Sequence, residues 1–333
     1  SSSSAASDVY KRQVLNHHYK RAGQLAIHSV WEFVFSVPDL QQAYDFYQAF
    51  GLNVKRSLAN DYLELYTYGH EHRWARVYRG GDKKRLQWIS FGIYPEDLDA
   101  FKQRIQDQNI ETIEPLETSD HPSIWIKNPD GLALQICVSE KVSPDQKSQV
   151  IHPVQFSLVG RASNRKAITQ VQPTHLSHIL TFTQDFDRTL QFYIDVLGLR
   201  VSDQSSGLVA FLHGAHGSDH HLLALSKSDG YGLHHSSWNV NRIDDVGLGK
   251  QQMEHAGYSQ GWGLGRHVLG SNYFYYVRDP WGSYAEYSHD IDFVPHTHDW
   301  PAADHPVEDS MYVWGPNPPQ DFVKNYETTA PVF

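Results

Sequence analysis

The fold is decided by a stretch that occurs twice: residues 30–54 read VWEFVFSVPDLQQAYDFYQAFGLNV, and residues 177–201 read SHILTFTQDFDRTLQFYIDVLGLRV. Each copy begins as an alternating strand and reaches an aspartate (Asp39 or Asp185) suited to capping a helix. Each then continues as an amphipathic helical segment with aromatic residues on one face and ends in Gly-Leu. The pattern therefore predicts a duplicated unit of strand, helix and strand.

Two further pairs of segments extend this repeat. RLQWISFGIYPEDLDAF at 85–101 resembles GLHHSSWNVNRIDDVGL at 232–248, and NPDGLALQIC at 128–137 resembles DPWGSYAEYS at 279–288. Repeats of this length favour gene duplication over a solenoid of short units. We predict an α+β fold of two homologous domains, each made of paired βαβββ modules that form a curved mixed sheet. The predicted boundaries are a disordered or non-native tail (1–27), an N-terminal non-catalytic domain (28–140), a linker (141–173), a C-terminal catalytic domain (174–292) and a tail that packs on it (293–333).

Composition narrows the class of protein. The 333 residues have 40% hydrophobic content, which suits a compact protein with two cores. The net charge of −10 gives no basic footprint for nucleic acid, and no apolar run approaches the roughly 20 residues that span a membrane. A single cysteine, Cys137, fits a reducing cytoplasm.

Three residues of the C-terminal copy form a candidate metal site. His178, His235 and Glu286 fall on three predicted strands, and two histidines with one carboxylate are the facial ligand set of non-heme Fe(II) oxygenases. Glu286 lies in an apolar, aromatic strand, where a buried carboxylate needs a cation. We align these positions with Glu32, Gln87 and Gln135 of the first copy, which lack that ligand set.

Several neighbouring histidines compete for the ligand positions. Strand alternation predicts that His234 faces away from His235, and His175 precedes the repeated strand. Taken singly, most strand histidines are surface or satisfied core residues. The repeat therefore favours His178 and His235, although residue chemistry alone leaves the metal site undecided.

Four motifs carry a resemblance to a known family: HLSHILTFTQDFDRTLQFYIDVLGL, GSDHHLLAL, GLHHSSWNV and GRHVLGSNYFYYVRDPWGSYAEYSHDID. They resemble the type I extradiol ring-cleaving dioxygenases of the vicinal oxygen chelate superfamily, particularly the catechol 2,3-dioxygenase (metapyrocatechase) group. The resemblance covers about residues 28–325. It implies a glyoxalase-like fold, an inert N-terminal domain, and insertion of both atoms of O₂ into a catechol to give a muconic semialdehyde-type product.

The same resemblance implies roles for single residues. It implies Fe(II) at His178, His235 and Glu286, with Mn(II) as the alternative metal. It further implies that His221 is the acid–base histidine, that Tyr276 hydrogen-bonds a substrate oxygen, and that His267 lines the substrate side. Homo-oligomeric assembly is also implied.

Other interpretations remain open at this point. A glyoxalase-like isomerase or transferase has the same fold and accepts glutamate and glutamine as ligands, so Glu32 and Gln87 are not automatically inert. A non-catalytic protein that binds an aromatic ligand is a third possibility. We expect the pocket to include some of Trp238, His213, Phe274 and the C-terminal tail.

Overall fold

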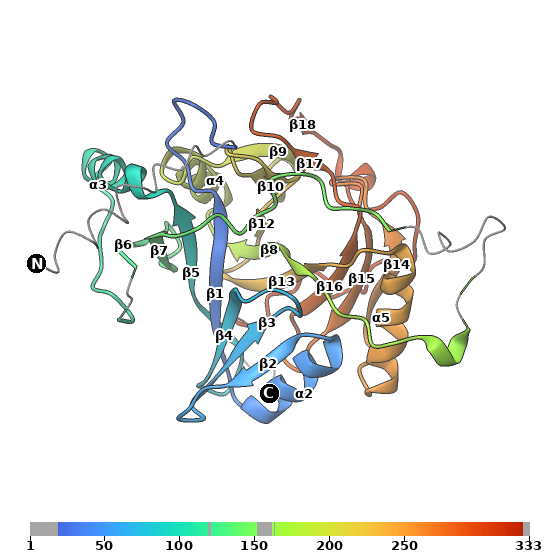
Figure 1. The fold of residues 1–333 in the computed structure, drawn as a ribbon. Helices are drawn as coiled ribbons and strands as arrows, with labels where there is room; N and C mark the ends of the chain where they lie inside the picture. The colour runs from blue at the N-terminus through green and yellow to red at the C-terminus, as the bar shows by residue number, and fades with distance from the viewer. Residues whose placement is uncertain (1–18, 119–120, 152–161, 163, 329–333) are drawn as a thin grey trace, which may run out of the picture.

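The computed structural model describes residues 19–118, 121–151, 162 and 164–328. Two sheets dominate it, and they lie side by side in Figure 1. The N-terminal sheet has the order β2-β3-β4-β1-β5-β7-β6, and the C-terminal sheet has the order β14-β15-β16-β13-β8-β12-β10-β9-β18. Residues 1–18 of the predicted N-terminal tail lie outside the described residues. The chain is already part of the core before residue 28, however, because Ile27 is buried and its N–H donates to the carbonyl of Leu197 at 2.9 Å.

The N-terminal sheet is built from two modules. The first comprises β1 (Ser29–Val37), α2 (Leu40–Phe50), β2 (Asn53–Arg56), β3 (Tyr62–Tyr66) and β4 (Arg73–Arg79). The second comprises β5 (Arg85–Ile93), the 3₁₀ turn η1 (Pro95–Asp97), α3 (Leu98–Asp107), β6 (Ser123–Lys127) and β7 (Ala133–Val138). This second module has two described strands after its helix. An isolated bridge between Thr112 and Ile126 stands where a third would lie.

The C-terminal sheet repeats this order with additions. Its first module comprises β8 (His175–Thr183), α4 (Phe186–Asp195), β9 (Arg200–Ser205), β10 (Val209–His213) and β12 (Leu223–Lys227). Its second comprises β13 (Gly232–Asn239), α5 (Ile243–His255), β14 (Gly261–Arg266), β15 (Tyr273–Arg278) and β16 (Tyr284–His289). Short elements complete the described chain: η2 (Arg165–Ala167), β11 (Ser218–Asp219), β17 (Phe293–Val294), β18 (Ala303–Asp304) and η3 (Val307–Asp309).

The pairing of strands confirms the predicted duplication. β1 runs parallel to β4 and antiparallel to β5, as β8 does to β12 and β13. The predicted helix starts are also confirmed, because the Asp39 side chain accepts hydrogen bonds from the backbone of α2 and Asp185 accepts one from that of α4. Gly51 ends α2 in the left-handed conformation, with φ of 99°.

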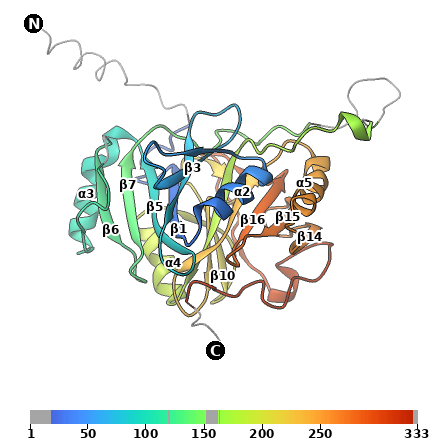
Figure 2. The same cartoon turned by 90° about the horizontal axis from the view of Figure 1, so that it is seen from below.

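The composition suggested two cores, but one hydrophobic core joins the two halves. The rings of Phe50, at the end of α2, and Tyr287, in β16, stack at 4.0 Å, and the Tyr287 hydroxyl donates to the Phe50 carbonyl at 2.7 Å. Figures 1 and 2 accordingly show α2 beside β16 in both views. A buried ion pair also crosses between the halves, with Lys84 Nζ 2.5 Å from Asp279 Oδ2. The N-terminal half therefore supports the sheet that carries the candidate site.

The C-terminal tail packs against both halves. Glu327 is buried, and its carboxylate accepts the N–H of Leu86 at 2.7 Å and that of Leu233 at 2.8 Å. Phe322 packs in a small aromatic cluster with Trp262 and Tyr276. The tail thus closes over the strands that bear the candidate ligands. Among the described residues, no helix is long and apolar enough to cross a membrane.

Candidate active site

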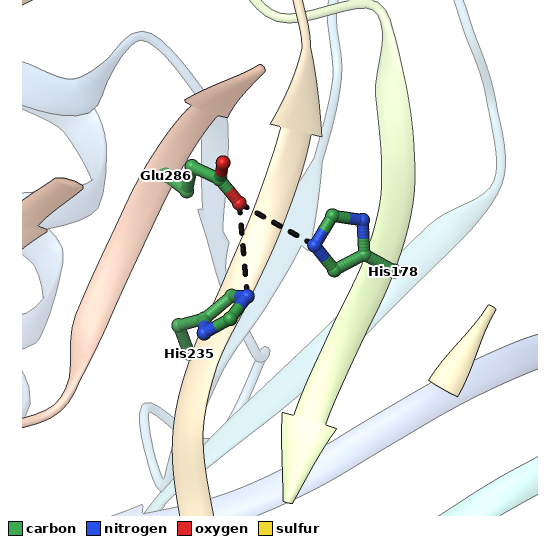
Figure 3. A group of neighbouring side chains, drawn as sticks. All are labelled: His178, His235 and Glu286. Atoms are coloured by element: carbon green, nitrogen blue, oxygen red, sulfur yellow. Dashed lines mark ion pairs between the residues drawn. The ribbon is translucent and has the colours of Figure 1, made fainter. Parts of the chain in front are cut away.

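The three candidate ligands come together on three neighbouring strands. Figure 3 shows His178 on β8, His235 on β13 and Glu286 on β16 directed toward one point. Glu286 Oε2 lies 3.4 Å from His178 Nε2 and 3.6 Å from His235 Nε2, and all three ligand atoms lie within 4.8 Å of one another. The register of the strands explains this meeting, because Ser237 of β13 is paired with both His178 and Glu286.

The hydrogen bonding of these ligands fits a metal ion. His235 Nε2 and Glu286 Oε2 are buried without a hydrogen-bond partner among the described residues. Two such atoms facing each other in a protein interior are costly unless something binds both. Burial would raise the pKa of Glu286, but the neighbouring imidazoles of His178, His267 and His235 hold it well below its usual value. The site therefore offers an ionised carboxylate and two imidazoles to a divalent cation.

Asn272 orients the carboxylate. Its side-chain amide donates to Glu286 Oε1 at 3.1 Å and to the Ser288 hydroxyl at 2.9 Å, and it is buried. Oε1 is thereby held away from the ligand cluster, and Oε2 is left facing the histidines. The repeat gave no signal for Asn272, because it lies in the turn before β15 and its partners are 14 and 16 residues away.

The three residues with roles implied by the resemblance lie around this cluster. The ring of His221 is 3.9 Å from that of His178, and Tyr276 lies 5.1 Å from His235, measured between centroids. His267 Nε2 lies 2.9 Å from the Tyr276 hydroxyl. Because His267 Nδ1 donates to the Met311 carbonyl at 2.6 Å, Nε2 of a neutral His267 accepts a hydrogen bond from the Tyr276 hydroxyl.

Burial shifts the pKa values of these groups in opposite directions. Burial first, and then the carboxylate of Glu286, raise the pKa of Tyr276 well above its usual value, so this phenol stays protonated and can donate. Burial, followed by the neighbouring His178, holds the pKa of His221 well below its usual value. The protein alone therefore presents a neutral imidazole and a phenolic donor beside the ligand cluster.

A cavity of about 360 Å³ opens next to these groups, within the range of roughly 300–1,000 Å³ that is usual for small-ligand sites. Its polar floor includes His178, His221, His235, His267 and Tyr276. Most of the other lining residues are apolar, and they include Leu208, Phe211, Leu269, Val307, Met311 and Phe322. The tail contributes to it as expected. Trp238, His213 and Phe274, by contrast, are buried and do not line it, although Phe274 stacks on the ring of His267 at 4.0 Å.

A larger groove of about 770 Å³ lies along α5. None of the six predicted site residues lines it. Volume alone is a weaker indicator of a site than convergent polar groups, so the smaller cavity is the candidate active site.

One predicted orientation is wrong. His234 was expected to face away from His235, yet both line the cavity, and their Nδ1 atoms are 2.7 Å apart. The register between β8 and β13 shifts between Leu233 and His235, so that His234 is the extra residue of a bulge. A bulge breaks the alternation on which the prediction rested.

The same irregularity corrects the alignment of the first copy. Glu32 pairs with Ser90 in the first copy, as His178 pairs with Ser237 in the second. Trp88 lies two residues before Ser90, and His235 lies two residues before Ser237. Trp88 therefore occupies the place of His235. Gln87 was the predicted counterpart, but it corresponds to His234 and donates to the Ser36 hydroxyl at 3.0 Å. Gln135 corresponds to Glu286 as predicted, because it pairs with Ser90 in β5.

Two arginines occupy the first copy in place of a metal. Glu32 is buried, and its Oε1 accepts from Arg73 Nε at 2.7 Å. Its Oε2 accepts from Arg76 Nη2, also at 2.7 Å. By strand register, Arg73 stands where the second copy has His221. Both oxygens of Glu32 are thus neutralised by guanidinium groups, and Trp88 offers no ligand atom to a metal.

Comparison with known proteins agrees with this geometry. Residues 29–136 and 175–287 match the family model described as Glyoxalase/Bleomycin resistance protein/Dioxygenase superfamily. The chain is 45% identical to Metapyrocatechase 2 of Cupriavidus necator over 302 residues. The matched region covers 91% of this chain and 93% of that protein. It is also 30% identical over 149 residues to biphenyl-2,3-diol 1,2-dioxygenase of Metapseudomonas furukawaii, covering 42% of this chain and 46% of that one.

Solved structures share the fold. A Mn(II)-bound glyoxalase from Novosphingobium aromaticivorans has a TM-score of 0.70 at 23% identity, covering 89% of this chain and 93% of that one. The 2,2',3-trihydroxybiphenyl 1,2-dioxygenase of Sphingomonas wittichii has a TM-score of 0.68 at 18% identity, covering 88% of this chain and all of the other. The chain belongs to the glyoxalase/dioxygenase superfamily and, within it, to the metapyrocatechase family of extradiol dioxygenases.

Proposed function

We propose that the protein cleaves the ring of a catechol beside its two hydroxyl groups, using Fe(II) and O₂. The observation that carries this proposal is the pair of unpartnered buried atoms, His235 Nε2 and Glu286 Oε2, which face each other beside His178 and open onto an apolar cavity. The 45% identity to a metapyrocatechase supports the same reaction class.

His178, His235 and Glu286 would hold the metal. Bound there, Fe(II) would keep positions open for two substrate oxygens and O₂, and its charge would lower the pKa of a catechol hydroxyl. The ligand set alone does not choose the metal, because Mn(II) accepts the same ligands and a Mn(II)-bound glyoxalase has this fold. We therefore assign iron from the sequence similarity to metapyrocatechase.

The remaining residues would handle protons and orientation. His221 is neutral and lies against His178, so it can accept a proton from the substrate and later return it to the reacting oxygen. On substrate binding, the Tyr276 hydroxyl would turn its one proton from His267 to a substrate oxygen, while the Met311 carbonyl would keep His267 in place beside the phenol. The apolar wall of the cavity would exclude water, which strengthens these interactions.

The first copy acts as scaffold in this proposal. A second active site there would need a free ligand set, but Glu32 is held by Arg73 and Arg76, and Trp88 replaces a histidine. These contacts also disfavour a glyoxalase-like isomerase whose ligands include Glu32. Homo-oligomeric assembly and a cytoplasmic location, which the buried free Cys137 would suit, stay predictions.

The test separates the dioxygenase from the isomerase by its need for O₂. The protein is loaded with Fe(II) without oxygen, mixed with catechol, and then exposed to air. We expect a yellow ring-fission product to form only after air is admitted. Turnover of a substrate in the strict absence of O₂ would support the isomerase instead, and iron-loaded protein that binds catechol without turnover would support a non-catalytic binding protein.

The ligand assignment has its own test. His178→Ala and Glu286→Ala should each lose the metal, whereas His175→Ala, which removes a neighbouring histidine of the same strand that is not part of the cluster, should keep it. Normal iron content in His178→Ala and Glu286→Ala would refute the assignment.

A further inference from the structure

Two pairs of adjacent histidines in the C-terminal half share one arrangement. In each pair the Nδ1 atoms face each other, at 3.0 Å between His220 and His221 and at 2.7 Å between His234 and His235. A contact between two ring nitrogens holds one proton, so one ring donates and the other accepts. Which ring donates is decided by what the outer histidine binds with its second nitrogen.

The pair at 234 and 235 shows how this works. His234 Nε2 lies 2.7 Å from the Phe322 carbonyl, which can only accept, so His234 carries its proton on Nε2. A neutral His234 then accepts at Nδ1, His235 donates from Nδ1, and His235 Nε2 is left without a proton. That is the form in which an imidazole binds a metal, so the hydrogen bonds agree with the ligand assignment.

The pair at 220 and 221 ends on a carboxylate. His220 is fully buried, and its Nε2 lies 2.8 Å from Asp203 Oδ2. The other oxygen, Asp203 Oδ1, accepts from the N–H of Ala303 at 3.1 Å and lies 2.8 Å from His305 Nε2. Hydrogen bonds from His220 and His305 outweigh burial and keep the pKa of Asp203 below its usual value, so Asp203 accepts.

We propose that Asp203 and His220 are positioning residues that hold His221 with its proton on Nδ1 and with an unprotonated Nε2 toward the cavity. The importance of this tautomer for catalysis rests on the proposed function. In this form His221 starts as a proton acceptor, suited to take the first proton of a catechol. A carboxylate behind a histidine sets the tautomer of a catalytic histidine in Ser–His–Asp enzymes in the same way.

Asp203→Asn should reverse donor and acceptor in each hydrogen bond that links residue 203 through His220 to His221, because it replaces one carboxylate oxygen by NH₂. The amide oxygen of the asparagine should stay on the side of Oδ1, which has Ala303 N at 3.1 Å and His305 Nε2 at 2.8 Å, because the other donor, Trp300 Nε1, lies 3.4 Å from Oδ2. Its NH₂ group would then face His220 Nε2, which would have to accept. His220 would donate from Nδ1, and His221 would carry its proton on Nε2, toward the cavity.

The direct test is long-range ¹H–¹⁵N NMR of the histidine rings, with His221 assigned through His221→Phe. The full-length protein is measured without metal and loaded with diamagnetic Zn(II). We expect His221 to be protonated at Nδ1 in the wild type and at Nε2 in Asp203→Asn. His305→Ala, which leaves the bond between Asp203 and His220, should match the wild type. Protonation of wild-type His221 at Nε2, or of both nitrogens of His220, would overturn the proposal.

Kinetics test the catalytic role separately. Asp203→Asn should keep its iron and its KM but lose about 10²–10⁴-fold in kcat, the range for a misoriented acid–base histidine. Full activity of a variant with the inverted tautomer would overturn the positioning role. If NMR shows the expected tautomers but the iron-loaded protein cleaves no catechol, the proposed function is refuted, whereas the assignment of the hydrogen bonds still holds.

Discussion

Asn272 donates a hydrogen bond to Glu286, and we predict that losing this bond weakens metal binding. Asn272→Leu removes the amide while keeping a similar side-chain volume. A buried hydrogen bond to a charged group contributes about 1.5–3 kcal/mol. If that free energy appears in metal binding, affinity should fall about 10- to 100-fold, which is also the usual effect of removing a residue that orients a ligand.

Ser288→Ala is the matched control. It removes the other hydrogen-bond partner of the Asn272 amide but leaves the contact with Glu286. Both variants lose a buried hydrogen bond, so both should lower the free energy of unfolding of the metal-free protein by about 1 kcal/mol or more. Only Asn272→Leu should weaken metal binding.

The assay is a competition titration of Fe(II) against a coloured chelator without oxygen, accompanied by urea unfolding of the metal-free protein. Wild-type affinity in Asn272→Leu would refute the claim that this amide orients Glu286. An equal loss of affinity in Ser288→Ala would show that the effect is a general loosening of the strand.

Three further predictions concern other parts of the chain. His221→Phe should retain iron but lower kcat by about 10²–10⁴-fold, and wild-type turnover measured at normal iron content would contradict its acid–base role. Lys84→Met should destabilise the protein by about 3–5 kcal/mol in urea unfolding, because it leaves the buried Asp279 carboxylate unpaired. Adding Asp279→Asn should recover much of that loss, and no recovery would argue against the pairing. Burial lowers the pKa of His28 to about 3, so the folded protein keeps His28 neutral while the unfolded chain takes up a proton below pH 6.5. Stability should therefore fall as pH drops from 6.5 toward 3, by about 2 kcal/mol from this residue between pH 6.5 and 5, and the slope should be shallower in His28→Gln but not in the exposed control His255→Gln.

Much of the fold could be predicted from the sequence because its signals are local. Asp39 and Asp185 mark helix starts through hydrogen bonds to the following turn. The repeated strands also predict which positions meet at the centre of each sheet. The meeting of His178 with Glu286 follows from that repeat, since equivalent strands pair in the same register in both halves.

Bulges and distant partners limited the prediction of the site. A bulge shifts the register by one residue, which moved Trp88 into the place assigned to Gln87 and brought His234 to the cavity. Asp203 and His220 are 17 residues apart, and His305 is a further 102 residues from Asp203. Sequence spacing carries no signal for contacts of this kind, because tertiary packing alone creates them.

The central claim is that this cluster directs ring opening beside the diol, and the structure of the product tests it most directly. Iron-loaded protein is held with catechol without oxygen, a measured amount of O₂ is added, and the product is identified by NMR while O₂ uptake is recorded. We predict one ring opened for each O₂ consumed and a hydroxymuconic semialdehyde as the product. A muconic diacid, cleaved between the two oxygens, or ring opening without O₂ would contradict the account.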